Sequence, residues 1–310
     1  MIKLTDLILE QTNRPKVVIM AGGAGVGKTY LLNQLELGSL QQVNPDKYVE
    51  DPDHPAYNNL GQGARLADKE AEDLADEKTS FVWDTTASNP KKIQFFLDKG
   101  YDVYIVMVYT HPMISYISNF QLRKRNIPAS AVFQTWRNVY QLIDQYNKMT
   151  KGNLSIFVSD RGGKYDKEIE AFNTAAKNGT KGIKDYLSNY NEKHGIEGST
   201  FFKPVEMSKQ EEEEFLKAAR DVDYDRSHRS EDKAVKQAFL KAYRANGVGP
   251  GDDKLRDAVK KYRDRKEKND KRAEEVLENI AEMLFSPLFQ KKLEHSTPQE
   301  IDSKVQQFLA

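Results

Sequence analysis

The stretch from Val17 to Leu32, VVIMAGGAGVGKTYLL, decides the fold of this 310-residue chain. An apolar, β-branched run leads into a glycine-rich loop, and a second apolar run with helical character follows. The pattern G-x-x-x-x-G-K-[ST] is satisfied by Gly22, Gly27, Lys28 and Thr29. A glycine-rich turn without a ligand is the alternative, but the motif has its required strand and helix on the correct sides. The sequence therefore predicts a site that binds a nucleoside triphosphate.

The chemistry expected of this loop follows from its backbone. Glycines let the loop curl so that successive N–H groups point at phosphate oxygens, and the helix that follows presents its positive end to the same anion. We expect Lys28 to act on the β- and γ-phosphates as a catalytic cation and the Thr29 hydroxyl to ligate Mg²⁺. The predicted cofactors are ATP or GTP and Mg²⁺. The predicted nucleotide contacts are Gly22, Gly23, Ala24, Gly25, Val26, Gly27, Lys28, Thr29 and Tyr30.

Composition argues against several other classes of protein. Charged residues make up 30% of the chain and hydrophobic residues 38%, which is typical of soluble globular proteins. The 47 basic and 47 acidic residues balance, so no overall field attracts nucleic acid or an anionic membrane. The absence of cysteine excludes disulfides, thiolate zinc sites and a cysteine nucleophile. No apolar run has the length of a membrane-spanning helix, and we expect a soluble, cytoplasmic protein.

Five apolar runs are predicted to be strands, and helical patterns separate them. The strands are expected over Val17–Ala21, Leu40–Val43, Ser80–Trp83, Asp102–Tyr109 and Leu154–Ser159. Helices are expected over about residues 28–37, 57–78, 89–99, 112–122 and 130–149. This alternation predicts an α/β fold with a five-stranded, mostly parallel sheet and helices on both faces. Ligands of such sheets bind at the carboxyl ends of the strands, so the residues that follow each strand are the candidates for a site.

The strand patterns end near residue 164. Helices are expected over Asp166–Asn178 and Ile183–His194, and a more densely charged segment with helical spacing begins after residue 204. We expect a nucleotide-binding core over residues 1–165, a helical extension of it over 166–204 and a charged α-helical C-terminal region over 205–310.

Two carboxylates follow predicted strands on the rim that carries the phosphate loop. Asp46 lies three residues after the second strand, where it could accept the proton of an attacking hydroxyl or only form a turn after proline. Asp84 ends the third strand, where it could hold Mg²⁺ or orient an acceptor. Thr85 and Thr86 follow it, in place of the glutamate that mechanical ATPases use to activate water. This pattern favours transfer to a bound acceptor.

Basic side chains follow the predicted helix over 112–122. Arg123 and Arg125 lie in a turn that could close over the polyphosphate, where guanidinium groups would meet the charge of the transferring phosphoryl group. Arg137 is a second candidate substrate contact. The alternative is a solvated helix end, because cations favour helix C-termini. Asp160 and Arg161 follow the fifth strand, where they form either a contact to the nucleoside or a simple turn.

Four segments together resemble the zeta-toxin-like branch of the P-loop kinases over roughly residues 15–165: GGAGVGKT, NPDKYVEDPDHP, FVWDTTASN and LRKRNIP. The resemblance implies the fold of a small-molecule kinase with a lid, ATP or GTP as donor with Mg²⁺, and, for the toxins, an amino-sugar nucleotide as acceptor. It also implies that Asp46 is the base that activates the acceptor hydroxyl.

The same resemblance assigns further residues to the substrate. Asp84 and Thr86 fall on the family's acidic and threonine substrate contacts, and Arg123 or Arg125 falls on its lid arginines. Ser88 departs from the pattern, because the toxins tend to carry an arginine there.

The sequence thus predicts an ATP-dependent phosphotransferase that moves the γ-phosphate to a hydroxyl of a small molecule or nucleotide sugar. One alternative is a polynucleotide 5′-kinase, for which the basic stretch Lys254–Arg272 could hold the strand. The other is a nucleotide-gated interaction module, whose C-terminal helices bind a partner protein.

Overall fold

The computed structural model describes residues 14–37, 40–57, 59–123, 129–196, 253–293 and 295–310. The chain divides into two compact units, residues 1–199 with 276–310 and residues 200–275. The first unit carries the sheet and the phosphate loop. Of the second unit, the described part is the beginning of a long helix, α14, which runs over Asp253–Phe285.

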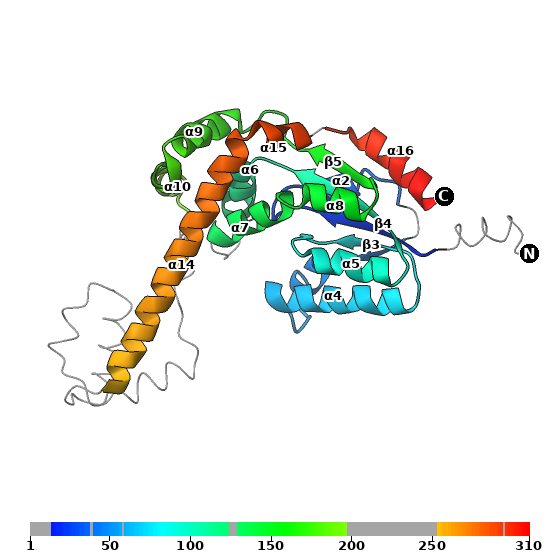
Figure 1. Ribbon diagram of the computed structural model, residues 1–310, viewed down its shortest axis with the longest axis horizontal. Helices are drawn as coiled ribbons and strands as arrows, with labels where there is room; N and C mark the ends of the chain where they lie inside the picture. Colours follow the sequence, from blue (N-terminus) through cyan, green and yellow to red (C-terminus); the bar gives the residue numbers. More distant parts are fainter. Residues whose placement is uncertain (1–13, 38–39, 58, 124–128, 197–252, 294) are drawn as a thin grey trace, which may run out of the picture. The chain divides into compact units, whose positions relative to one another are not determined.

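The first unit is built on a five-stranded, all-parallel sheet with the strand order β2-β3-β1-β4-β5 (Figure 1). The strands are β1 Lys16–Ala21, β2 Gln41–Val43, β3 Phe81–Asp84, β4 Asp102–Tyr109 and β5 Leu154–Val158. The central strand β1 is apolar along its length and fully buried from Val17 to Ala21, as expected of a parallel strand covered on both faces. The predicted fold class is confirmed.

Helices connect the strands and extend beyond them. Those of the first unit up to residue 199 are α2 Lys28–Leu32, α3 Asp46–Val49, α4 Leu60–Asp76, α5 Pro90–Asp98, α6 Pro112–Ile117, η1 Ser118–Leu122, α7 Ala129–Tyr140, α8 Ile143–Met149, α9 Asp166–Ala176 and α10 Gly179–His194. After α14 come α15 Pro287–Lys292 and α16 Pro298–Leu309. Local signals set several of these starts: Asn89 accepts a hydrogen bond from the Lys91 N–H, and Pro90 opens α5.

Both faces of the sheet are covered. On one face, Leu31 of α2 and Ile301 of α16 pack in one core cluster with Val18 of β1. On the other face, the ring of Phe96 in α5 lies 5.4 Å from the ring of Trp83 in β3. Among the helices that the structure describes, none combines the length and apolar character needed to cross a bilayer.

Three predicted helices differ from the observed ones. The helix after the phosphate loop ends at Leu32 and not at Leu37. Leu31 and Leu37 share one core cluster, and a continued helix would point them about 120° apart, so the chain turns instead. The helix predicted over 112–122 changes to a π-helix at Ser118, and the one predicted over 130–149 divides into α7 and α8.

The C-terminal helix α16 packs on the sheet and belongs to the first unit. Ile301 and Val305 are fully buried, and the Lys16 ammonium donates to the Leu309 carbonyl at 2.7 Å. This differs from the single region 205–310 expected from charge density. Charge density averages over the segment, whereas α16 is amphipathic and buries its apolar side.

Candidate active site

The phosphate loop occupies the turn between β1 and α2. Gly25 and Gly27 both have left-handed backbones, with φ of +75° and +101°. Space also restricts Gly25, since a Cβ there would lie 2.7 Å from Asn119 Nδ2. Glycine is therefore required by conformation at both positions and by close packing at one of them. The loop has the backbone needed to direct N–H groups at an anion.

The Lys28 side chain folds over the phosphate loop. Its ammonium donates to the carbonyls of Gly22 at 3.2 Å and Gly23 at 3.4 Å. The same ammonium lies 3.6 Å from Asp84 Oδ1, at the carboxyl end of β3. The side chain thus places one positive charge between the loop and a carboxylate from the neighbouring strand.

Asp84 is a buried carboxylate, with 7% of its surface exposed. Burial raises the pKa of its carboxyl, the Lys28 ammonium opposes this rise, and the nearby Asp46 carboxylate adds to it. The Arg123 guanidinium also lowers this pKa, though less. Four charged groups from four segments of the chain therefore act on one another at this rim of the sheet.

These groups line a cavity of about 310 Å³ beside the phosphate loop. Of the residues predicted from the sequence, it is lined by Ala24, Gly25, Val26, Gly27, Lys28, Thr29, Asp46, Asp84, Thr86 and Arg123. Further side chains that the sequence did not single out complete the lining, among them Asn44, Thr135 and Val132. The cavity places two cations, two carboxylates and threonine hydroxyls beside an anion-binding loop, a set of groups that can support phosphoryl transfer, and we call it the transfer cavity.

Asp46 owes its position to the end of β2. Its backbone N–H donates to Asn44 Oδ1 at 2.8 Å, so the sequence Asn-Pro-Asp forms a turn that begins α3. Helix α4 packs closely on this turn, because a Cβ on Gly63 would lie 2.4 Å from Val49 Cγ1. The asparagine at position 44 was the sequence signal for this turn.

Arg123 reaches the transfer cavity from the end of the π-helix η1. Its N–H donates to the Ser118 carbonyl at 3.2 Å, a bond that spans five residues. Ser115 Oγ and Asn119 Nδ2 donate to the Ala24 carbonyl at 2.6 and 3.0 Å, which fastens this segment to the phosphate loop. No local sequence pattern indicates this π-helix, whose Asn119 contacts a loop 95 residues away in the chain.

Four predicted contacts do not line the transfer cavity, and a fifth lies outside the described residues. Arg137 donates from Nε and Nη2 to Asn138 Oδ1 at 3.2 and 2.9 Å. Tyr30 is 57% exposed and lines a different cavity. Gly22 and Gly23 face Lys28 instead. Arg125 lies outside the described residues.

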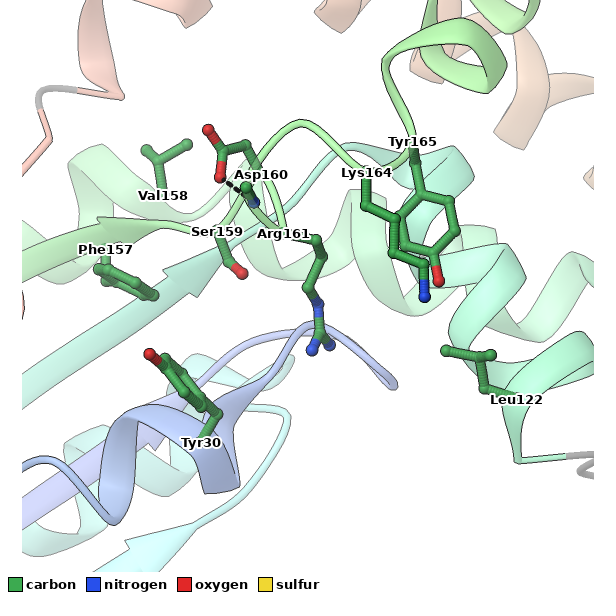
Figure 2. Close-up of a pocket in the computed structure, with 10 residues that line it drawn as sticks. Tyr30, Leu122, Phe157, Val158, Ser159, Asp160, Arg161, Lys164 and Tyr165 are labelled. Carbon is green, nitrogen blue, oxygen red and sulfur yellow. Dashed lines mark hydrogen bonds between the residues drawn. The ribbon is translucent and has the colours of Figure 1, made fainter.

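That second cavity, of about 400 Å³, lies at the loop after β5 (Figure 2). Aromatic side chains contribute to its wall: Tyr30, Phe157 and Tyr165. Figure 2 shows the Arg161 side chain pointing from the loop after β5 toward the phosphate loop, where Nη2 donates to the Gly25 carbonyl at 3.2 Å. Arg161 thus connects the wall of this cavity to the phosphate loop, which lines the transfer cavity, and we call this one the outer cavity.

Comparison with known proteins gives one family and distant structural likenesses. The family model described as Zeta toxin matches residues 3–165. No curated protein sequence matches the chain. A solved structure from the PezAT chromosomal toxin–antitoxin system of Streptococcus pneumoniae is 21% identical, over 48% of this chain and 70% of that one, with a TM-score of 0.35. The structure of AvrRxo1-ORF1:-ORF2 with ATP is 14% identical, over 82% and 87%, with a TM-score of 0.37.

Proposed function

The chain belongs to the zeta toxin family, and from this premise we propose that it is a P-loop kinase that transfers the γ-phosphate of ATP or GTP to a hydroxyl of a small molecule or nucleotide sugar. Family membership supports a nucleotide-dependent, kinase-like function. The observation that carries the finer proposal is the transfer cavity, where Lys28, Asp84, Asp46 and Arg123 line one space with the phosphate loop.

The donor is proposed to bind across the phosphate loop. Its γ-phosphate enters the transfer cavity beside Lys28, and its nucleoside occupies the outer cavity, where aromatic side chains offer flat apolar surfaces to a base. The Thr29 hydroxyl and the Asp84 carboxylate line the same cavity and are the oxygen ligands that Mg²⁺ prefers. Bound there, the ion would neutralise charge on the β- and γ-phosphates.

The reaction proposed is an in-line displacement. Asp46 accepts the proton of the acceptor hydroxyl, whose oxygen forms a bond to the γ-phosphorus while the bond from that phosphorus to ADP breaks. Arg123 and Lys28 face the negative charge that spreads over the transferring group. Asp84 orients Lys28 through their 3.6 Å contact.

The proposed acceptor carries several hydroxyl groups. The side chains that line the transfer cavity beyond the charged groups combine the hydroxyls of Thr85, Thr86 and Thr135 and the amide of Asn44 with small apolar residues. Such a surface suits a sugar, which pairs polar edges with short apolar faces. Among small molecules and nucleotide sugars, we therefore propose a nucleotide sugar as the acceptor.

A transfer assay tests the proposal. The protein is incubated with Mg²⁺, γ-labelled ATP and, separately, amino-sugar nucleotides, nucleosides and 5′-hydroxyl oligonucleotides. We expect label on a sugar hydroxyl and no transfer by the Lys28→Ala variant. Label on the oligonucleotides instead would identify a polynucleotide 5′-kinase. Slow hydrolysis alone across the panel would contradict the kinase proposal and favour a nucleotide-gated module with a protein partner.

A further inference from the structure

We propose that Arg161 binds the α- and β-phosphates of the donor nucleotide, an inference that rests on the proposed function. Arg161 lies on the loop between β5 and α9, 136 residues after Gly25 of the phosphate loop. No part of the phosphate-loop motif predicts this residue. Its assignment comes from three properties of the folded chain: its contact with the phosphate loop, its backbone and its place in the wall of the outer cavity.

The contact places a guanidinium group directly over the phosphate loop. Arg161 Nη2 donates to the Gly25 carbonyl at 3.2 Å, and a Cβ built on Gly27 would lie 3.5 Å from the same nitrogen. Gly25 and Gly27 belong to the segment whose N–H groups are expected to surround a phosphate. An anion bound to that segment would therefore meet the guanidinium group within a short side-chain movement.

The backbone at this position is one that arginine rarely adopts. Arg161 has a φ of +59°, and Gly162 and Gly163 follow with +64° and +71°. The Asp160 carboxylate accepts a hydrogen bond from the Gly162 N–H at 2.8 Å and closes the turn. Glycine would occupy position 161 with less strain, as it does at the next two positions. Residues held in such conformations are common at ligand sites, where the surrounding structure maintains them.

The cavity that Arg161 lines and its contact with Gly25 together indicate which phosphates it binds. The γ-phosphate must enter the transfer cavity to meet Asp46 and the acceptor, and Arg161 does not line that cavity. Arg161 lines the outer cavity, where the nucleoside is proposed to bind. The α- and β-phosphates join these two parts of the donor and must pass over the loop beneath the guanidinium group. Its planar fork can donate two parallel hydrogen bonds to phosphate oxygens.

A purely structural role is the competing explanation. The hydrogen bond to Gly25 ties the loop after β5 to the phosphate loop, and Arg161 itself is exposed. The two explanations differ in what a substitution does. A tie between loops contributes to stability whatever ligand is present, whereas a phosphate contact changes affinity only for ligands that carry the phosphates.

The experiment measures ligand affinities by calorimetry for the full-length protein with Mg²⁺, using adenosine, ADP and a non-hydrolysable ATP analogue. Arg161→Asn removes the charge, and asparagine tolerates the left-handed backbone. Arg161→Lys keeps the charge without the fork. Lys151→Asn is the matched control, because Lys151 is also a cation with a left-handed backbone, with φ of +55°, and lines neither cavity.

We expect Arg161→Asn to weaken ADP and the ATP analogue by similar factors of about ten or more, as for loss of a charge-assisted hydrogen bond. The adenosine affinity and the thermal midpoint of Arg161→Asn should stay at the wild-type values. Arg161→Lys should lose less phosphate-dependent affinity than Arg161→Asn, and Lys151→Asn should bind all three ligands as the wild type does. Unchanged ADP affinity in Arg161→Asn would overturn this inference but not the proposed function. A loss of affinity for the ATP analogue only, or an equal loss for adenosine, would do the same. Absence of nucleotide binding by the wild-type protein would overturn the proposed function as well.

Discussion

The Lys28 ammonium lies 3.6 Å from the Asp84 carboxylate and joins the phosphate loop to the end of β3. Both side chains are largely buried, with 14% and 9% of their surfaces exposed. The attraction does not compensate Asp84 for the loss of water, because the pKa of its carboxyl is raised despite the ion pair. A carboxylate that lowers stability at neutral pH is expected where function requires the charge.

Asp84→Asn should therefore raise the thermal midpoint at pH 7 while it abolishes phosphoryl transfer. The folded protein binds the Asp84 proton more tightly than the unfolded chain does, so wild-type stability falls as the pH rises from the ordinary value of 3.8 through the raised pKa. Asparagine removes that loss. Thermal unfolding of both proteins from pH 3 to 8 measures the difference in midpoint. The midpoint of the variant should exceed that of the wild type at pH 7, and the difference should vanish below about pH 3.8. A lower midpoint for the variant at pH 7 would contradict this account of Asp84.

Substitution of Asp46 should separate catalysis from donor binding. Asp46→Asn keeps the shape of the side chain but cannot accept the acceptor proton, so kcat should fall by a factor of about 100 to 10,000 with donor affinity nearly unchanged. Lys28→Ala should lower both kcat and donor affinity, because it removes the cation that we propose contacts the phosphates. Steady-state kinetics and nucleotide titrations measure the two effects. Full transfer activity in Asp46→Asn would exclude it as the base.

The tight packing at Gly25 gives a prediction for stability. Gly25→Ala places a methyl group 2.7 Å from Asn119 Nδ2 on a left-handed backbone. We expect the variant to lose about 2 to 4 kcal/mol of its free energy of unfolding and also to lose nucleotide binding. Gly152→Ala is the matched control, since Gly152 has φ of +92° with nothing within 4 Å of the added Cβ. It should cost about 1 kcal/mol and leave nucleotide binding intact. Equal losses in urea unfolding would show that the packing against Asn119 is unimportant.

His111 should make the fold sensitive to mild acid. Burial lowers the pKa of its imidazole to about 4, while its ring accepts from the Met113 N–H at 3.2 Å and contacts Asn173 Oδ1 at 3.1 Å. The unfolded chain takes up a proton near pH 6.5 that the folded protein resists until about pH 4, so stability falls as the pH drops through this window. The loss should be on the order of 3 kcal/mol.

His111→Asn tests this directly, because asparagine also caps helices and does not titrate. Its stability is expected to start lower than that of the wild type at pH 7. The difference between the two proteins in denaturant unfolding should then shrink between pH 6.5 and pH 4. A constant difference across this range would rule out His111 as the source of the acid sensitivity.

The sheet could be predicted because its signals are local. The strand Asp102–Tyr109 has the predicted bounds, since a continuous apolar run between a glycine and a polar turn specifies a buried parallel strand. The parallel order also follows from alternation of strands and helices, and it brings the residues after β1, β2 and β3 to one rim. That is why Lys28, Asp46 and Asp84 line one cavity, as the sequence led us to expect.

The features that escaped prediction depend on contacts between distant segments. Asn119 of the π-helix before Arg123 donates to the Ala24 carbonyl, and no local pattern encodes that contact. Arg137 carries a charge at helical spacing from the basic turn, but its guanidinium turns toward Asn138. Arg161 was predicted either to contact the nucleoside or to form a simple turn, and its contact with the Gly25 carbonyl depends on a left-handed backbone that no local pattern indicates. The roles of these residues in transfer stay predictions.

Phosphorus NMR of the reaction itself tests the central claim most directly. The protein is mixed with ATP, Mg²⁺ and the acceptor that was labelled in the transfer assay, and the phosphorus signals are followed over time. The Asp46→Asn variant is measured in parallel. The account predicts that ADP and a new phosphate ester appear in equal amounts with little inorganic phosphate, and that the variant forms the ester at less than about a hundredth of the wild-type rate. Release of ADP with inorganic phosphate alone, or equal ester formation by the variant, would contradict it.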